Sequence, residues 1–346
     1  MRTPIPPNRP RRNGAPFDLR DDLLTQLSSR IVGQPRAMTE IVPYVQMHRA
    51  GLAPDGRPVG VFLLLGPTGT GKTRTVEALA EVLHGSEKNL IRIDCGEFQM
   101  EHEVAKLIGA PPGYLGHRET TPMLTQQKLS SVASESSNLS LILFDEIEKA
   151  APSMTRLLLG VLDKAALRLG DNTAVNFERC LIFLTSNLGS DAMRKQLTPD
   201  FGFESMLAPA ASAGSGKLDA IGTGTVKRRF PPEFVNRIDA VITYRPLEED
   251  SMAIILDQQI YALQRHIEDR LQERAFGLEL TPSARRFLLE KGTSREFGAR
   301  ELKRTILRHL TQPLAALVES ARATPECVVH ADHSKGSPHL HFRIED

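Results

Sequence analysis

The sequence has no tryptophan, only three cysteines and almost no excess of either charge, with a formal net charge of +1 over 346 residues. Cys95, Cys180 and Cys327 are odd in number and widely spaced, which argues against both a disulfide framework and a zinc site. A protein built mainly to bind nucleic acid carries a basic face, and a near-neutral chain does not fit that class. We therefore expect a reduced, cytoplasmic protein without a nucleic-acid partner.

Long apolar segments are also missing. No run approaches the length of a membrane span, so we expect no membrane partner. Near the N-terminus, Arg2, Arg9, Arg11 and Arg12 stand among five prolines in residues 1–16. This stretch lacks the apolar core of a secretory signal, and its prolines oppose an amphipathic transit helix. We predict that residues 1–20 form a flexible arm, because they cannot bury enough apolar surface to order themselves.

A glycine-rich loop carries the strongest local signal. The apolar run Val61–Leu65 is typical of a buried strand, and Val76, Leu79, Ala80 and Leu83 recur at helical spacing after the loop. Between them stand Gly66, Pro67, Thr68, Gly69, Thr70, Gly71, Lys72 and Thr73, which fit the phosphate-binding pattern G-x-x-x-x-G-K-[ST]. Backbone N–H groups of such a loop close around phosphates, the lysine reaches the β- and γ-phosphates, and the hydroxyl after it can ligate Mg²⁺. The sequence thus predicts an ATP and Mg²⁺ site.

Two further apolar runs end in polar residues. The first ends in Asp145-Glu146. Asp145 is predicted to hold magnesium through water, and Glu146 is predicted to orient and deprotonate the attacking water. A pair of acids that only starts a helix is the alternative. The second run, Leu181–Leu184, ends in Thr185-Ser186-Asn187. Asn187 could hydrogen-bond the γ-phosphate and the water beside Glu146, although an asparagine here could instead cap a helix.

The order of these motifs resembles the AAA+ ATPases of the Clp class, and in particular the second ATPase module of ClpB-, ClpA- and ClpC-type proteins. The resemblance covers roughly residues 24–330. It is carried by "RIVGQPRAM" at 30–38, "GPTGTGKT" at 66–73, "LIRIDCGEF" at 90–98, "LIGAPPGYLG" at 107–116, "LFDEIEKA" at 143–150, "LTSNLGS" at 184–190, "FPPEFVNRID" at 230–239 and "FGARELKR" at 297–304.

The resemblance implies an α/β fold with a P-loop and a five-stranded parallel sheet in residues 21–245. A small, mostly helical lid is expected in residues 246–346. The residues themselves agree, since an apolar stripe runs from Met252 to Leu271 at helical spacing. The C-terminal segment alternates around a Lys-Gly-Ser-Pro turn, which predicts a β-hairpin.

The resemblance also assigns roles. Ile31 and Val32 match the segment that lines the adenine pocket. Arg237 matches the arginine finger that reaches the ATP of a neighbouring subunit, and Arg300 matches a lid arginine that contacts the phosphates. Both arginines are therefore expected to be catalytic. Taken alone, each would more simply be a solvated surface charge.

A loop tyrosine finds an explanation in the same resemblance. "GAPPGYLGH" at 109–117 places Tyr114 among glycines and prolines, where neither a helix nor a strand core is expected. In the Clp unfoldases such a loop lines the central pore of a hexamer and grips a threaded polypeptide. Gly113, Tyr114, Leu115 and Gly116 are thus the expected substrate pore loop. A tyrosine packed on its own subunit is the alternative.

Other features depart from the family. The usual members carry an N-terminal domain and a first ATPase module, and we expect this protein to have neither. Pro231 stands where arginine is common. Residues 117–121 and 163–174 also differ from the usual substrate-facing segments. We expect an ATP-driven unfoldase or disaggregase that acts as a homo-oligomeric ring, in the form of a hexamer, on unfolded or misfolded polypeptide. An ATP-dependent remodeller of one dedicated partner is the alternative, and a DNA-acting helicase loader fits poorly.

A final motif concerns partners. Phe201-Gly202-Phe203 resembles the loop tip with which protease-coupled relatives dock onto a ClpP-type barrel. The Ala-, Gly- and Ser-rich stretch that follows, up to Thr225, is typical of a flexible loop. Docking to such a protease, or use of an adaptor, is therefore a further hypothesis, and packing of both phenylalanines under their own loop is its alternative.

Overall fold

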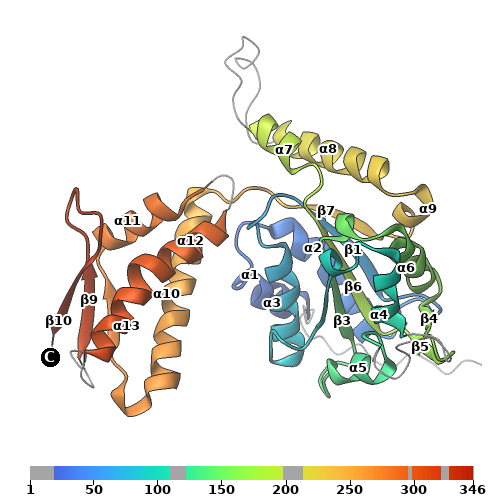
Figure 1. Cartoon of the computed structure of the whole chain (residues 1–346), viewed down its shortest axis with the longest axis horizontal. Coiled ribbons are helices and arrows are strands. Elements are labelled where there is room, and N and C mark those ends of the chain that lie inside the picture. The colour runs from blue at the N-terminus through green and yellow to red at the C-terminus, as the bar shows by residue number, and fades with distance from the viewer. Residues whose placement is uncertain (1–18, 110–121, 198–212, 295–297, 321–326, 346) are drawn as a thin grey trace, which may run out of the picture.

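The computed structural model describes residues 19–109, 122–197, 213–294, 298–320 and 327–345. Its described residues form a large domain, up to strand β7, and a small domain that begins with helix α10 (Figure 1). Most of the predicted arm, the pore loop Gly113–Gly116 and the segment Phe201–Phe203 lie outside the described residues.

A five-stranded sheet forms the centre of the large domain. Its strands are β1 (Gly60–Leu65), β2 (Ile91–Asp94), β3 (Ser140–Asp145), β6 (Cys180–Ser186) and β7 (Ala240–Thr243). They lie in the order β2-β3-β6-β1-β7, and every neighbouring pair is parallel. The predicted parallel sheet is confirmed. Strands β1, β3 and β6 are almost continuously apolar because helices cover both faces of the sheet.

The helices of the large domain divide between the two faces of the sheet. They are α1 (Leu19–Ser28), α2 (Pro35–Arg49), α3 (Lys72–His84), α4 (Ala105–Ile108), α5 (Gln126–Ser131), α6 (Pro152–Lys164), α7 (Ser190–Leu197), α8 (Ala213–Arg229) and α9 (Pro232–Val235). Leu63 of β1 packs in one cluster with α6, whereas Phe62 packs in a second cluster with α2 and α3. In Figure 1, α1 and α3 lie on the side that faces the small domain, and α6 and α9 lie on the opposite side.

Short elements connect the layers of the large domain. Turns of 3₁₀ helix span Cys95–Glu97, Glu101–Val104 and Ile147–Lys149, and β4 (Ala166–Arg168) pairs with β5 (Ala174–Asn176) in an antiparallel hairpin. Cys95, Cys180 and Cys327 are all buried and free.

In its described residues, the small domain packs four helices against a small sheet. The helices are α10 (Glu249–Leu271), α11 (Pro282–Gly292), α12 (Ala299–Ile306) and α13 (Gln312–Glu319), with a turn of 3₁₀ helix at Gln272–Arg274 and a π-helical turn at Leu307–Thr311. Strands β9 (Val328–Asp332) and β10 (His341–Glu345) form the predicted hairpin. Strand β8 (Gly277–Leu280) pairs parallel with β9, so the sheet has three strands rather than two.

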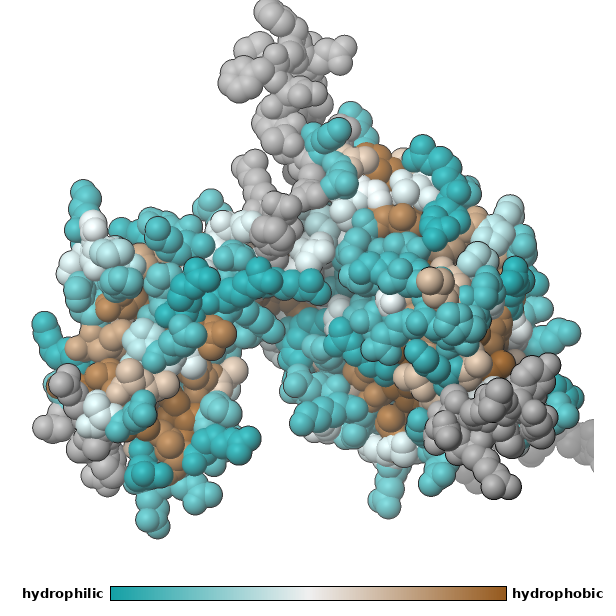
Figure 2. Space-filling view, viewed as in Figure 1, coloured by the Kyte–Doolittle hydropathy of each residue, from teal (hydrophilic) through white to brown (hydrophobic). Residues whose placement is uncertain are grey.

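The two domains are joined by residues 244–248, which contain no helix or strand. Figure 2 shows a notch in the molecular surface between the small domain on the left and the large domain on the right. None of the described helices is long and apolar enough to cross a membrane. The glycine loop lies next to the small domain, because the N–H of Ala299 in α12 donates to the carbonyl of Gly69.

We expect Leu302→Ala to destabilise the small domain. Leu302 is fully buried in the core of this domain, so its truncation should lower the free energy of unfolding by about 2–5 kcal/mol. Leu307 lies five residues further along and is 53% exposed, and Leu307→Ala should cost less than about 0.5 kcal/mol. Urea unfolding followed by circular dichroism measures both. Equal losses for the two variants would contradict this packing.

Candidate nucleotide-binding site

A cavity of about 300 Å³ lies where the carboxyl ends of the strands meet the small domain. Its lining includes most of the predicted site residues, namely Ile31, Val32, Thr68, Gly69, Thr70, Gly71, Lys72, Thr73, Asp145, Glu146, Asn187 and Arg300. Segments that are more than 200 residues apart in the sequence therefore meet in one place. Pro67 and Arg237 are not among its lining residues.

The glycine loop has the backbone that its sequence requires. Gly69 and Gly71 have φ angles of +78° and +103°, in a region that side chains rarely adopt, and α3 begins at Lys72. The hydroxyl of Thr70 donates to the carbonyl of Pro67 at 2.9 Å, which closes the loop on itself. Pro67 therefore shapes the loop through its carbonyl. The backbone N–H groups at the start of α3 are left to face an anion.

Lys72 is buried and fully engaged. Its ammonium donates to the carbonyls of Gly66 and Pro67, at 2.6 and 2.9 Å, and to Oδ1 of Asn187 at 2.9 Å. Burial lowers the pKa of this amine to about 8, while the nearby carboxylates of Glu148 and Asp145 partly oppose the change. The positive charge is thus held where phosphate would compensate the cost of its burial.

Two acids follow β3 at the edge of the cavity. Asp145 accepts a hydrogen bond from the hydroxyl of Thr185, on the neighbouring strand β6, and pairs with the guanidinium of Arg92. Glu146 has a left-handed backbone, with φ of +57°, and its N–H donates to the same Thr185 hydroxyl at 3.0 Å. This backbone conformation is uncommon for a residue with a side chain and turns Glu146 away from the strand direction.

The carboxylate of Glu146 has two partners. Oε1 accepts from the side-chain amide of Asn187 at 3.2 Å, and Oε2 pairs with the ammonium of Lys149 at 2.5 Å. Asn187 therefore contacts Lys72 through its oxygen and Glu146 through its nitrogen. A single amide sets the spacing between the cation that would hold phosphate and the candidate base.

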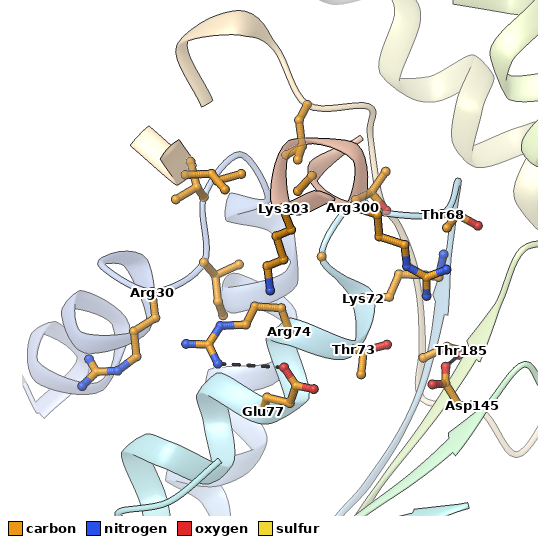
Figure 3. A pocket seen from close by; sticks show the side chains of 18 of the residues that line it. Arg30, Thr68, Lys72, Thr73, Arg74, Glu77, Asp145, Thr185, Arg300 and Lys303 are labelled. Carbon is orange, nitrogen blue, oxygen red and sulfur yellow. Dashed lines mark hydrogen bonds and ion pairs between the residues drawn. The ribbon is translucent and has the colours of Figure 1, made fainter. Parts of the chain in front are cut away.

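Helix α12 brings the small domain to the glycine loop. The N–H of Ala299 donates to the carbonyl of Gly69 at 3.1 Å. A Cβ on Gly298 would lie only 2.8 Å from that same carbonyl oxygen, so the close approach requires glycine. Figure 3 shows the Arg300 side chain directed toward Thr68 and Lys72, with Lys303 directed toward Arg74.

The opposite end of the cavity is less polar. Ile31, Val32, Leu247 and Ile255 line it together with Gln258 and Gln259. Gln258 donates to the carbonyl of Ser29 at 2.8 Å, which ties α10 to the segment before Ile31. A planar base would find aliphatic walls and side-chain amides at this end.

Arg237 lies away from the cavity of its own chain. It follows α9, and its Nε is 2.7 Å from a carboxylate oxygen of Asp163 at the end of α6. Both elements are on the side of the sheet opposite the small domain (Figure 1). The structure thus separates Arg237 from the other predicted catalytic residues.

Sequence reasoning missed several residues around the site. Glu148 accepts a hydrogen bond from the backbone N–H of Asn187 at 3.0 Å, and Thr185 contacts both acids. Arg74, Arg92 and Lys303 add positive charge to the lining. For Glu148 the available signal was its place two residues after Glu146, on the same short turn.

Comparisons with known proteins agree with this geometry. The family description "AAA domain (Cdc48 subfamily)" matches residues 57–241, and "C-terminal, D2-small domain, of ClpB protein" matches residues 247–331. Chaperone protein ClpB of Meiothermus ruber is 40% identical over 290 residues, which are 84% of this chain and 31% of that protein. Chaperone protein ClpB of Rhodopseudomonas palustris is 41% identical over 293 residues, which are 85% of this chain and 31% of that protein. The chain thus spans about a third of the length of these relatives.

A solved structure shows the same arrangement. The cryo-EM reconstruction of Hsp104 with ATPγS and FITC casein, in a closed state, superposes with a TM-score of 0.76 at 28% identity. The match covers 93% of this chain and 51% of that one. The AAA description covers the large α/β domain, and the ClpB-type description covers the small domain that follows it. This chain therefore belongs to the AAA domain (Cdc48 subfamily) family and is a Clp-class AAA+ module.

Proposed function

We propose that this protein is an ATPase that couples ATP hydrolysis to the unfolding or disaggregation of proteins. The observation that carries the proposal is the contact of one side chain, Asn187, with both Lys72 and Glu146 inside the cavity between the two domains. A phosphate-binding cation and a candidate base are thereby held together beside an arginine of the small domain. This is the arrangement that phosphoryl transfer to water requires.

ATP and Mg²⁺ fit the residues that are present. The hydroxyl of Thr73 and the carboxylate of Asp145 both line the cavity, and oxygen ligands of this kind suit Mg²⁺. Thr68–Lys72 would hold the phosphates, and Ile31 and Val32 would contact the base. Bound Mg²⁺ would neutralise charge on the phosphates.

The hydrolytic role of Glu146 rests on its neighbours. Its carboxylate would accept a proton from the attacking water, while the amide of Asn187 holds that carboxylate in place. Lys149 pairs with the second carboxylate oxygen of Glu146 at 2.5 Å and so also restrains its position. Arg300 would place a second positive charge beside the phosphates, so small-domain position and chemistry would be linked.

A ring of copies would complete the site. Arg237 is partly exposed on the side of the large domain away from its own cavity, and release of its pair with Asp163 would let it reach the cavity of a neighbour. Three of the large apolar side chains that are exposed among the described residues, Ile254, Tyr261 and Leu307, lie on the small domain. Such surface is available for contact with a second copy. These features and the family support the proposal of a homo-oligomer in the form of a hexamer.

The polypeptide substrate is inferred from the relatives. The Hsp104 reconstruction contains casein, and the ClpB relatives are chaperone proteins. We assign the grip on such a chain to Gly113–Gly116, with Tyr114 at its centre, and we expect the protein to work in the cytoplasm. A protease or adaptor partner at Phe201–Phe203 is left as a separate hypothesis, tested by retention of a ClpP-type barrel in the presence of ATP.

Two substitutions should separate ATP hydrolysis from binding of the polypeptide substrate. Glu146→Gln should retain ATP and slow its turnover by about 10²- to 10⁴-fold, because the general base is removed. Tyr114→Ala should keep basal turnover and lose ATP-dependent unfolding of a tagged fluorescent reporter. Glu101→Gln, at an exposed carboxylate that pairs with Arg156, is the control and should change neither rate. Wild-type turnover by Glu146→Gln would remove the assignment of the base.

Nucleotide binding should take up protons near pH 8. The pKa of Lys72 is lowered to about 8 in the nucleotide-free protein, so about half of the molecules carry a neutral amine at that pH. Bound phosphate favours the charged form, hence ADP binding should take up about half a proton at pH 8, and affinity should fall toward about tenfold per pH unit above it. Calorimetry in two buffers of different ionisation enthalpy measures this uptake. Binding without uptake at pH 8 would contradict a lowered pKa.

Mixed rings test Arg237. A variant with Arg237→Ala should lose most turnover, because a trans-acting arginine contributes roughly 10³–10⁵ in rate. Mixing it with Lys72→Ala subunits should restore part of the activity, since each variant supplies the group that the other lacks at a shared interface. If no mixing ratio restores turnover, Arg237 does not act across subunits.

A further inference from the structure

Gln34 joins three parts of the chain from a buried position. It precedes α2, and only 5% of its surface is exposed. Its side-chain amide donates to the carbonyl of Thr70 at 3.1 Å and to the carbonyl of Arg245 at 2.8 Å. Its Oε1 accepts from the N–H of Arg245 at 3.2 Å. Both N–H bonds of the amide are therefore used, one on the glycine loop and one on the segment between the domains.

The glycine loop is connected to the small domain through its carbonyls. Gly69 accepts from Ala299 at the start of α12, and the next carbonyl, of Thr70, accepts from Gln34. In such loops the N–H groups face the phosphates. A rotation of these peptides to meet phosphate would therefore move the carbonyls that hold α12 and Gln34.

Arg245 stands where the large domain ends. The preceding residue, Tyr244, is fixed by its N–H to the carbonyl of Leu65 at 2.7 Å and by its hydroxyl to Thr75 of α3 at 2.8 Å. Leu247, two residues after Arg245, already lines the cavity. Gln34 holds both the N–H and the carbonyl of Arg245, so it fixes the direction in which the chain leaves toward α10.

We propose that Gln34 is a positioning residue that transmits nucleotide occupancy of the glycine loop to the hinge at Arg245, and thereby to the angle of the small domain. The inference rests on the proposed nucleotide site. The planar side-chain amide of Gln34 moves as a unit. A displacement of the Thr70 carbonyl would therefore also displace the groups of Arg245 to which this amide is hydrogen-bonded. Without Gln34 the loop would still bind phosphate through Lys72 and its N–H groups, but the linker would no longer respond.

The test compares two glutamines that make the same kind of bridge. Gln264 on α10 donates to Phe276 and Glu268 and accepts from the N–H of Leu278, entirely within the small domain. Gln34→Met and Gln264→Met each replace the amide by an apolar chain of similar length. Hydrogen exchange of the linker amides, those of Tyr244, Arg245, Leu247 and Glu248, is measured in the full chain with and without ADP and Mg²⁺. The dissociation constant for ADP is measured as well.

In the wild type and in Gln264→Met, we expect ADP to slow exchange of the linker by at least about fivefold, the protection that one hydrogen bond gives. In Gln34→Met we expect ADP to bind but to slow exchange of the linker by less than about twofold. A purely structural role would speed exchange equally in both states and leave the ratio unchanged, which would overturn the inference. So would a folded Gln34→Met that no longer binds ADP, because Gln34 would then shape the loop itself. Failure of the wild type to bind ADP would overturn the proposed function and this inference together.

Discussion

The buried ammonium of Lys72 is the group around which the rest of the site is arranged. A charged amine is costly to remove from water unless hydrogen-bond acceptors surround it. Two backbone carbonyls of the glycine loop and the amide oxygen of Asn187 supply them. This requirement accounts for one neighbour of β1 in the sheet, because β6 must end beside the loop for Asn187 to reach the lysine.

The same arrangement explains why nucleotide chemistry and domain position depend on each other. The glycine loop uses the N–H side of its peptides for phosphate, while its carbonyls hold Lys72, α12 and Gln34. A movement of these loop peptides would therefore also move Lys72, α12 or Gln34. A short segment thus serves as the common support of the catalytic residues and of the small domain.

The sequence predicted those parts of the fold whose cause is local. Val61–Leu65 reads as a buried strand because it is apolar without interruption, and the loop after it is specified by a motif whose glycines need positive φ angles. Strand β8 escaped prediction because its four residues are ordered by β9, about fifty positions later. The roles of Gln34 and Glu148 were not predicted for a related reason. Each side chain contacts backbone groups that only the tertiary fold brings within reach.

The three buried cysteines have a practical consequence. Burial raises the pKa of the Cys180 thiol to about 12 and that of Cys95 well above its ordinary value. Only the thiolate reacts with alkylating reagents, and Cys327 is shielded as well. A cysteine introduced on the surface would therefore be the preferred site of labelling in the otherwise native chain. Pairs of fluorophores, one on each domain, could then report the distance between the two domains directly.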